Sequence, residues 1–167
     1  IAHMDWLGID RAVVLQEFMD GKQDDYLSEV RRACPHRFSC MALFDHRYYD
    51  DPLGSFEKAI DRDRLQGFLV KSPDPFPELA TRQLLPLWQA CAERALPLVL
   101  KNGKASDLRK LIAAVPGIRL VLSHFAGILE DPEDYEEKLR LVASEPNVTI
   151  DSGALTYLQR YPFPLAK

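Results

Sequence analysis

The sequence has no long hydrophobic run and no excess of positive charge. No apolar stretch approaches the roughly 18 residues that a membrane helix needs, and the N-terminus lacks the charged and then apolar pattern of a signal peptide. The 167 residues carry 21 Lys and Arg against 25 Asp and Glu, a net charge of -4, which does not favour binding to nucleic acid or anionic lipid. We therefore expect a cytoplasmic protein that acts on a small molecule and has neither nucleic-acid nor membrane partners.

Cysteine pairs and glycine-rich motifs are also missing. The three cysteines, Cys34, Cys40 and Cys91, show no C-x-x-C spacing, and two of them lie in or beside apolar runs, so we expect reduced and mostly buried thiols. No G-x-G-x-x-G pattern follows a strand-like segment, and residues 102–104 (NGK) lack the remaining spacing of a phosphate-binding loop. The absence of both glycine-rich motifs excludes nucleotide-cofactor dehydrogenases and P-loop enzymes.

Six short apolar runs are spread along the chain. Each is continuous and does not alternate with polar residues, which is typical of strands buried on both faces. Segments with a helical period separate them, and successive runs begin 22 to 30 residues apart, close to the length of one strand plus one crossover helix. The pattern predicts a parallel α/β sheet in a single domain over residues 1–167. The runs are residues 12–15, 38–44, 67–70, 96–100, 118–122 and 148–150.

Two of the intervening helices have clear boundaries in the sequence. Residues 106–107 (SD) open an apolar stripe with helical spacing. A second helix is expected to begin after Asp131 as its N-cap and to turn Tyr135, Leu139 and Val142 toward the core. A third helix is expected over residues 86–95, and weaker helical patterns cover residues 26–34 and 56–65.

Alternating strands and helices fit either a barrel or an open doubly wound sheet. Nearly every apolar run here ends in a polar or ionisable group, as expected for a barrel enzyme that draws its site from many strand ends; an open sheet concentrates its ligand at one switch point. We therefore predict a TIM (β/α)₈ barrel. Because a whole barrel usually needs about 250 residues, we expect an incomplete one that holds strands 2 to 7. The polar residues are Gln16, Asp45, His46, Lys71, Lys101, Asn102, His124, Asp151 and Ser152.

Four stretches, in order along the chain, resemble the amidohydrolase-related family of the amidohydrolase superfamily, which includes aromatic-acid decarboxylases and lactone hydrolases. They are residues 4–16 (MDWLGIDRAVVLQ), 90–100 (ACAERALPLVL), 121–127 (VLSHFAG) and 146–153 (PNVTIDSG). The resemblance implies a barrel with one divalent metal, held by a His-x-His pair after the first strand, a His after the fifth and an Asp after the eighth. It also implies a further His after the sixth strand, as general base or metal-adjacent acid.

Two positions decide how this resemblance applies. With residues 12–15 as the second strand, His124 follows the sixth and is the expected acid or base, whereas the fifth-strand position carries Lys101. A protonated lysine cannot replace a neutral imidazole as a metal ligand. Either the metal, expected to be Zn or Mn, is held by fewer protein ligands, or the protein works without one. The other implied ligands are expected mostly outside this chain.

The resulting hypothesis is a hydrolase or decarboxylase that acts on a small carboxylated ring or lactone. A metal-independent lactone hydrolase and a non-catalytic binding barrel are the alternatives, and open sheet edges make a homo-oligomer possible. Each site residue also has a structural interpretation: a histidine bonded to loop backbone, lysines whose ammonium groups reach water, or ordinary turn residues. The residues expected at the site are His124 as the catalytic acid or base and, against the substrate, Lys101, Lys71, Asp45, Asn102 and Ser152.

Overall fold

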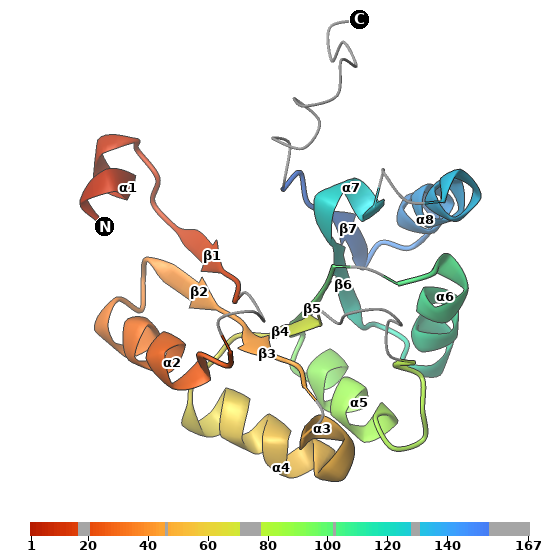
Figure 1. Cartoon of the computed structure of the whole chain (residues 1–167), viewed down its shortest axis with the longest axis horizontal. Helices are drawn as coiled ribbons and strands as arrows, with labels where there is room; N and C mark the ends of the chain where they lie inside the picture. Colours follow the sequence, from red (N-terminus) through yellow and green to blue (C-terminus); the bar gives the residue numbers. More distant parts are fainter. Residues whose placement is uncertain (17–20, 46, 71–77, 102, 128–130, 154–167) are drawn as a thin grey trace, which may run out of the picture.

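All paired strands in the structure are parallel. A computed structural model describes residues 1–16, 21–45, 47–70, 78–101, 103–127 and 131–153. The strand order follows the chain, first as the pair β1-β2 and then as the sheet β3-β4-β5-β6-β7 (Figure 1). The strands are β1 (Ala12–Val14), β2 (Phe38–Cys40), β3 (Ala42–Leu43), β4 (Phe68–Val70), β5 (Pro97–Leu100), β6 (Arg119–Leu122) and β7 (Val148–Ile150).

The run predicted as one strand over residues 38–44 is divided at Met41. The Met41 N–H donates to the Val14 carbonyl at 3.1 Å, whereas the next N–H, of Ala42, donates to the Gly67 carbonyl at 2.9 Å. The chain thus changes from pairing with β1 to pairing with β4, and the two sheets are joined through this segment. Gly67 is required there because a Cβ at this position would lie 2.4 Å from the carbonyl oxygen of Pro97.

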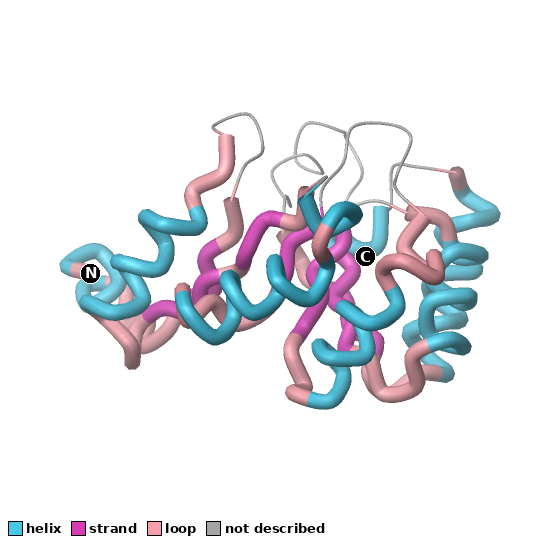
Figure 2. Tube along the Cα trace, turned by 90° about the horizontal axis from the view of Figure 1, so that it is seen from below, coloured by secondary structure: helices cyan, strands magenta, loops and turns pink. Residues whose placement is uncertain are grey.

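Helices α2, α4, α5, α6 and α8 lie along the convex side of the curved row of strands (Figure 1). Seen at right angles, they run beside the strands (Figure 2). This alternation of strand and helix along a curved parallel sheet confirms the α/β class and the incomplete barrel. The helices are α1 (Ala2–Trp6), α2 (Asp24–Ala33), α3 (Arg47–Asp50), α4 (Pro52–Phe56), a π-helical continuation (Glu57–Arg62), α5 (Leu85–Glu93), α6 (Ala105–Ala114), α7 (Ser123–Gly127) and α8 (Pro132–Ser144).

Apolar side chains pack on both faces of the sheet, which explains why the runs are continuous in the sequence. The inner, concave face carries a small cluster of strand residues, and the outer face joins the helices in a larger one. A layer of side chains enclosed by parallel strands is the usual interior of this barrel type. The inner cluster is Met41, Leu43, Leu69 and Val99, with Val121 beside it; large members of the outer one are Phe68, Leu98, Leu120, Trp88, Leu108, Leu111 and Leu141.

Of three predictions about α6 and α8, one is confirmed and two are wrong. Asp131 caps α8 by accepting a hydrogen bond from the Glu133 N–H at 2.9 Å, as predicted. The prediction that Leu139 faces the core is wrong: it is 39% exposed, because the buried side of α8 runs through Lys138 and Leu141. The opening of α6 was also wrong, since this helix begins at Ala105 without a side-chain cap of its own.

The first N–H of α6 is instead satisfied by a residue of α8. The Ala105 N–H donates to Oδ1 of Asp134 at 2.8 Å, and the other oxygen of Asp134 lies 2.9 Å from the Lys138 ammonium. Lys138 is almost fully buried. The acidic start of α8 therefore joins two neighbouring helices, α6 and α8. Among the described residues, no helix is long and apolar enough to cross a membrane.

Candidate active site

The carboxyl ends of the strands gather the residues predicted for the site. Asp45 follows β3, Lys101 follows β5, His124 follows β6 and Ser152 follows β7, and parallel strands bring such ends to one edge of the sheet. The predicted site residues Lys71 and Asn102, together with His46, lie outside the described residues.

His124 begins an unusual left-handed turn. β6 ends at Leu122, and α7 then has positive φ at His124 (56°), Phe125 (54°) and Ala126 (59°). A residue other than glycine in this conformation costs roughly 1–2 kcal/mol, because its Cβ crowds the following carbonyl. Strain of this kind persists only where neighbouring groups hold it, and it gathers at functional sites.

The adjacent strand end supplies the groups that hold this turn. One oxygen of Asp151, Oδ1, accepts the His124 N–H at 3.0 Å and the Gly153 N–H at 2.8 Å. The Asp151 carbonyl accepts the Phe125 N–H at 3.0 Å, and the Asp151 N–H donates to the Leu122 carbonyl at 3.0 Å. Asp151 was predicted only as an end-of-strand residue, and its role as the partner of the His124 backbone is new.

The His124 ring lies against a glycine. A Cβ added at Gly153 would sit 3.7 Å from Cδ2 of the imidazole and 2.9 Å from Oδ1 of Asp151. Ser152, between Asp151 and Gly153, is exposed. The β7 end thus passes close to the imidazole and leaves the Ser152 side chain accessible to solvent.

Lys101 leaves the neighbouring strand on the inner face. Its N–H continues the ladder by donating to the Val70 carbonyl at 3.2 Å, and its side chain is half-buried. Side chains alternate along a strand, so position 101 shares the face of Val99, which belongs to the inner cluster. Since β5 pairs with β6, the lysine and His124 come from adjacent strand ends.

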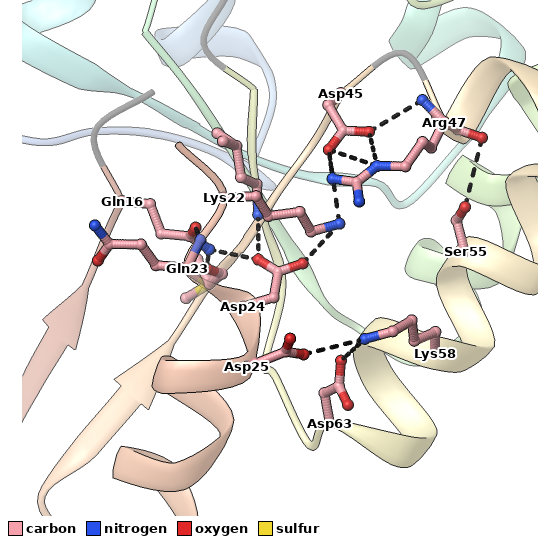
Figure 3. A network of polar contacts seen from close by, with 12 residues as sticks. Gln16, Lys22, Gln23, Asp24, Asp25, Asp45, Arg47, Ser55, Lys58 and Asp63 are labelled. Carbon is pink, nitrogen blue, oxygen red and sulfur yellow. Dashed lines mark hydrogen bonds and ion pairs between the residues drawn. The ribbon is translucent and has the colours of Figure 1, made fainter. Parts of the chain in front are cut away.

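A second polar group lies at the ends of the first strands, built around a buried carboxylate that sequence reasoning missed (Figure 3). Asp24 is 3% exposed. Its Oδ1 accepts hydrogen bonds from Nε2 of Gln16 at 2.6 Å and from the Leu43 N–H at 3.1 Å, and its Oδ2 lies 2.8 Å from the Lys22 ammonium. The sequence signal for Asp24 was its place in the first turn of the helix that follows the first strand, whose end carries Gln16.

Asp45 belongs to the same group through its two cationic neighbours. Its carboxylate accepts hydrogen bonds from the Arg47 backbone N–H at 3.0 Å and Nε at 2.8 Å, and lies 3.6 Å from the Lys22 ammonium. Burial alone would raise the pKa of Asp45, but the Arg47 hydrogen bonds and the Lys22 charge outweigh it and hold that pKa below its usual range. Lys22 also lies 5.4 Å above the ring of Tyr48.

The described residues do not form a metal centre by themselves. Within these ranges, no three His, Cys, Asp or Glu side chains are grouped closely enough to hold an ion. At the strand ends around His124, the neighbouring positions carry an ammonium in Lys101 and an Asp151 oxygen that already accepts two N–H groups.

The sequence model of one family, described as amidohydrolase, matches residues 2–166. No curated protein sequence was found to match the chain. Among solved structures, an uncharacterised TIM-barrel protein from Bordetella bronchiseptica is similar with a TM-score of 0.69 and 14% identity, over 95% of this chain and 63% of that one.

Two further structures carry functional names. A probable 2-pyrone-4,6-dicarboxylic acid hydrolase from Acinetobacter baumannii, with citric acid bound, has a TM-score of 0.69 and 18% identity over 94% of this chain and 59% of its own. A 5-carboxyvanillate decarboxylase from Novosphingobium aromaticivorans, with bound manganese, has a TM-score of 0.56 and 14% identity over 94% and 59%. These likenesses concern the fold, and the chain spans about three fifths of the length of each of these proteins.

Proposed function

The chain belongs to the amidohydrolase family, and from this membership we propose that it forms part of a hydrolase or decarboxylase of a small carboxylated ring or lactone. The observation that carries the proposal is His124 in a strained turn at the end of β6. The names of two similar structures, a pyrone-dicarboxylic acid hydrolase and a carboxyvanillate decarboxylase, both describe carboxylated rings.

His124 would move the proton in either reaction. An imidazole titrates near neutral pH and so can both accept and donate a proton. In hydrolysis, it takes a proton from the water that attacks the lactone carbonyl and returns it to the leaving oxygen. In decarboxylation, the bond between ring carbon and carboxylate breaks, its electron pair stays on the ring carbon, and the imidazolium protonates that carbon as CO₂ leaves.

Lys101 would bind the anionic part of the substrate. Its side chain is half-buried beside the β6 end, and a partly dehydrated ammonium attracts a carboxylate more strongly than one in bulk water. Of the other positions expected to contact substrate, Ser152 offers an exposed hydroxyl. Asp45 reaches the substrate only if its bonds to Arg47 open.

A divalent ion, zinc or manganese, is part of this proposal as a family trait. Such an ion polarises a carbonyl or activates water when bound, and its ligands would have to include residues outside those described here. Lys101 at the fifth-strand position favours a second candidate, a lactone hydrolase in which Lys101 and His124 polarise the carbonyl without metal. Activity that survives removal of metal with a chelator would select this candidate.

The test uses the protein as its gene encodes it, assayed with 2-pyrone-4,6-dicarboxylate and 5-carboxyvanillate, with and without added Mn²⁺ or Zn²⁺. We expect His124→Gln to lower kcat/KM by at least about 100-fold, the usual contribution of a general acid or base. His36→Gln is the matched control, because His36 is exposed and lies just before β2, at the opposite end of the sheet. Full activity of His124→Gln would refute the role of His124, and no turnover of any carboxylated ring or lactone would favour a non-catalytic binding barrel.

A further inference from the structure

The left-handed turn at His124 has no local cause in its own sequence. None of His124, Phe125 and Ala126 is a glycine or asparagine, the residues that adopt positive φ readily. The turn must therefore be imposed from outside. The groups that bond to its first two residues both belong to Asp151, through the side-chain oxygen on the His124 N–H and the carbonyl on the Phe125 N–H.

One oxygen of the Asp151 carboxylate, Oδ1, is directed at backbone N–H groups. Oδ1 accepts the His124 N–H from one strand end and the Gly153 N–H from its own. A backbone N–H bond to an ionised carboxylate is stronger than one to a neutral acceptor. This oxygen therefore joins the β6 and β7 ends and is not available to a substrate.

Gly153 completes the arrangement. A Cβ there would come within 2.9 Å of Asp151 Oδ1, too close for the carboxylate to keep its place, whereas its distance of 3.7 Å to the imidazole Cδ2 is an ordinary van der Waals contact. The Asp151–Gly153 segment thus fixes the backbone from which the His124 ring extends, through the hydrogen bond of the His124 N–H to Asp151 Oδ1.

We propose that Asp151 is a positioning residue that holds the His124 imidazole at the mouth of the sheet, with Gly153 providing the space for the Asp151 carboxylate. The proposal rests on the proposed function, in which His124 transfers the proton. The clamp, by which we mean the hydrogen bonds that Asp151 accepts from the His124 turn and from Gly153, can be tested without a substrate. It gives Asp151, predicted only as a polar residue at a strand end, a role that acts through His124.

The first experiment measures the clamp directly by NMR. In Asp151→Ala, we expect the backbone amides of His124 and Gly153 to exchange with solvent at least about 10-fold faster, since their acceptor is gone. The nuclear Overhauser contact between His124 Hδ2 and Gly153 Hα is expected in the natural protein, and we expect Asp151→Ala to lose it. Asp151→Asn should keep both the slow amide exchange and the Overhauser contact, because an amide oxygen can accept the same two hydrogen bonds.

Asp131→Ala is the matched control. Asp131 likewise accepts a hydrogen bond from the N–H two residues further on, at 2.9 Å, but does so at the start of α8. We expect this variant to lower the melting temperature and leave the exchange of the His124 amide unchanged. Unchanged exchange and an unchanged Overhauser contact in Asp151→Ala would overturn the proposal.

The second experiment is a double-mutant cycle in the enzyme assay. A misplacement of about 1 Å can cost about 100-fold in rate, so we expect Asp151→Ala to lower kcat by about that factor with little change in KM. In the His124→Gln background the same change should cost nothing further, because both act through one group. An equal loss in both backgrounds would refute positioning and assign Asp151 a role of its own. Full activity of His124→Gln would overturn the proposed function, while the NMR result would still decide whether the clamp exists.

Discussion

Replacing Asp24 by alanine tests the buried polar group at the ends of the first strands. Asp24 is 3% exposed and accepts hydrogen bonds from Gln16 at 2.6 Å and from the Leu43 N–H at 3.1 Å, besides its ion pair with Lys22. Asp24→Ala leaves the two N–H donors without an acceptor. A hydrogen bond to a charged group contributes about 1.5–3 kcal/mol.

The expected loss is smaller than the sum of these bonds. Lys22 keeps 22% of its side chain in solvent, so its charge can be rehydrated and the ion pair adds little. We expect the free energy of unfolding to fall by about 3 kcal/mol, since buried donors that lose their acceptor cost about 1–3 kcal/mol each. For a protein of this size each kcal/mol lowers the melting temperature by about 2–4 °C, which predicts a loss of about 6–12 °C.

Asp25→Ala is the control that isolates burial from position. Asp25 also lies in the first turn of α2, so its interaction with the helix dipole is similar. Its side chain is, however, 92% exposed, and within the described part of the chain its ion pair is with Lys58 at 3.3 Å. We expect this variant to change the free energy of unfolding by less than about 0.5 kcal/mol. Urea unfolding of both variants at pH 7 gives the comparison, and equal losses would refute the view that Asp24 is buried and shared between strand ends.

Three further predictions concern charge, thiols and the sheet edge. Because the pKa of Asp45 is lowered in the folded state, its stabilising effect is complete above its unfolded pKa of about 4 and is lost as the pH falls through the lower folded value, so melting curves of Asp45→Asn should depend less on pH below about 4. Cys34 is half-buried, whereas burial raises the pKa of Cys91 to about 12; a thiol reagent at pH 8 should modify Cys34 in the folded protein and Cys91 only after denaturation. Val13 of β1 is 60% exposed on a strand with one described neighbour. The 167-residue polypeptide should therefore self-associate, and Val13→Lys should lower the average molar mass of the assembly that light scattering measures.

The sequence predicted the sheet well because its central strands β3, β4 and β5 are buried on both faces. Every described strand lies within its predicted apolar run. A run such as residues 118–122 can be identified in the sequence without knowing which strand it pairs with. The break at Met41 was not predictable in the same way. It depends on which neighbour each N–H reaches, Val14 on one side and Gly67 on the other, and apolar patterning contains no such information.

Errors in the sequence prediction occur where a contact joins distant parts of the chain. The N-terminal N–H of α6 is bonded by Asp134, a residue 29 positions from Ala105, so no local capping signal exists to be found. Asp24 was overlooked for the same reason, since its partner N–H belongs to Leu43, 19 positions away. Propensity and periodicity describe neighbours along the chain, and buried polar groups are satisfied by neighbours in space.

The same distinction separates what the sequence predicted about His124 from what it did not. Its place at a strand end followed from the apolar run before it, but the shape of the turn depends on Asp151, 27 residues further on. Three left-handed residues cost about 3–6 kcal/mol at about 1–2 each. The Asp151 carboxylate accepts one hydrogen bond from the turn, worth about 1.5–3 kcal/mol, and the Asp151 carbonyl accepts a second, worth about 0.5–1.5 kcal/mol. Because these amounts are comparable, we expect the turn to depend on the two acceptors of Asp151. A histidine after β6 is therefore insufficient to predict a proton-transfer site in this sheet; the end of β7 must also supply an acceptor for its backbone.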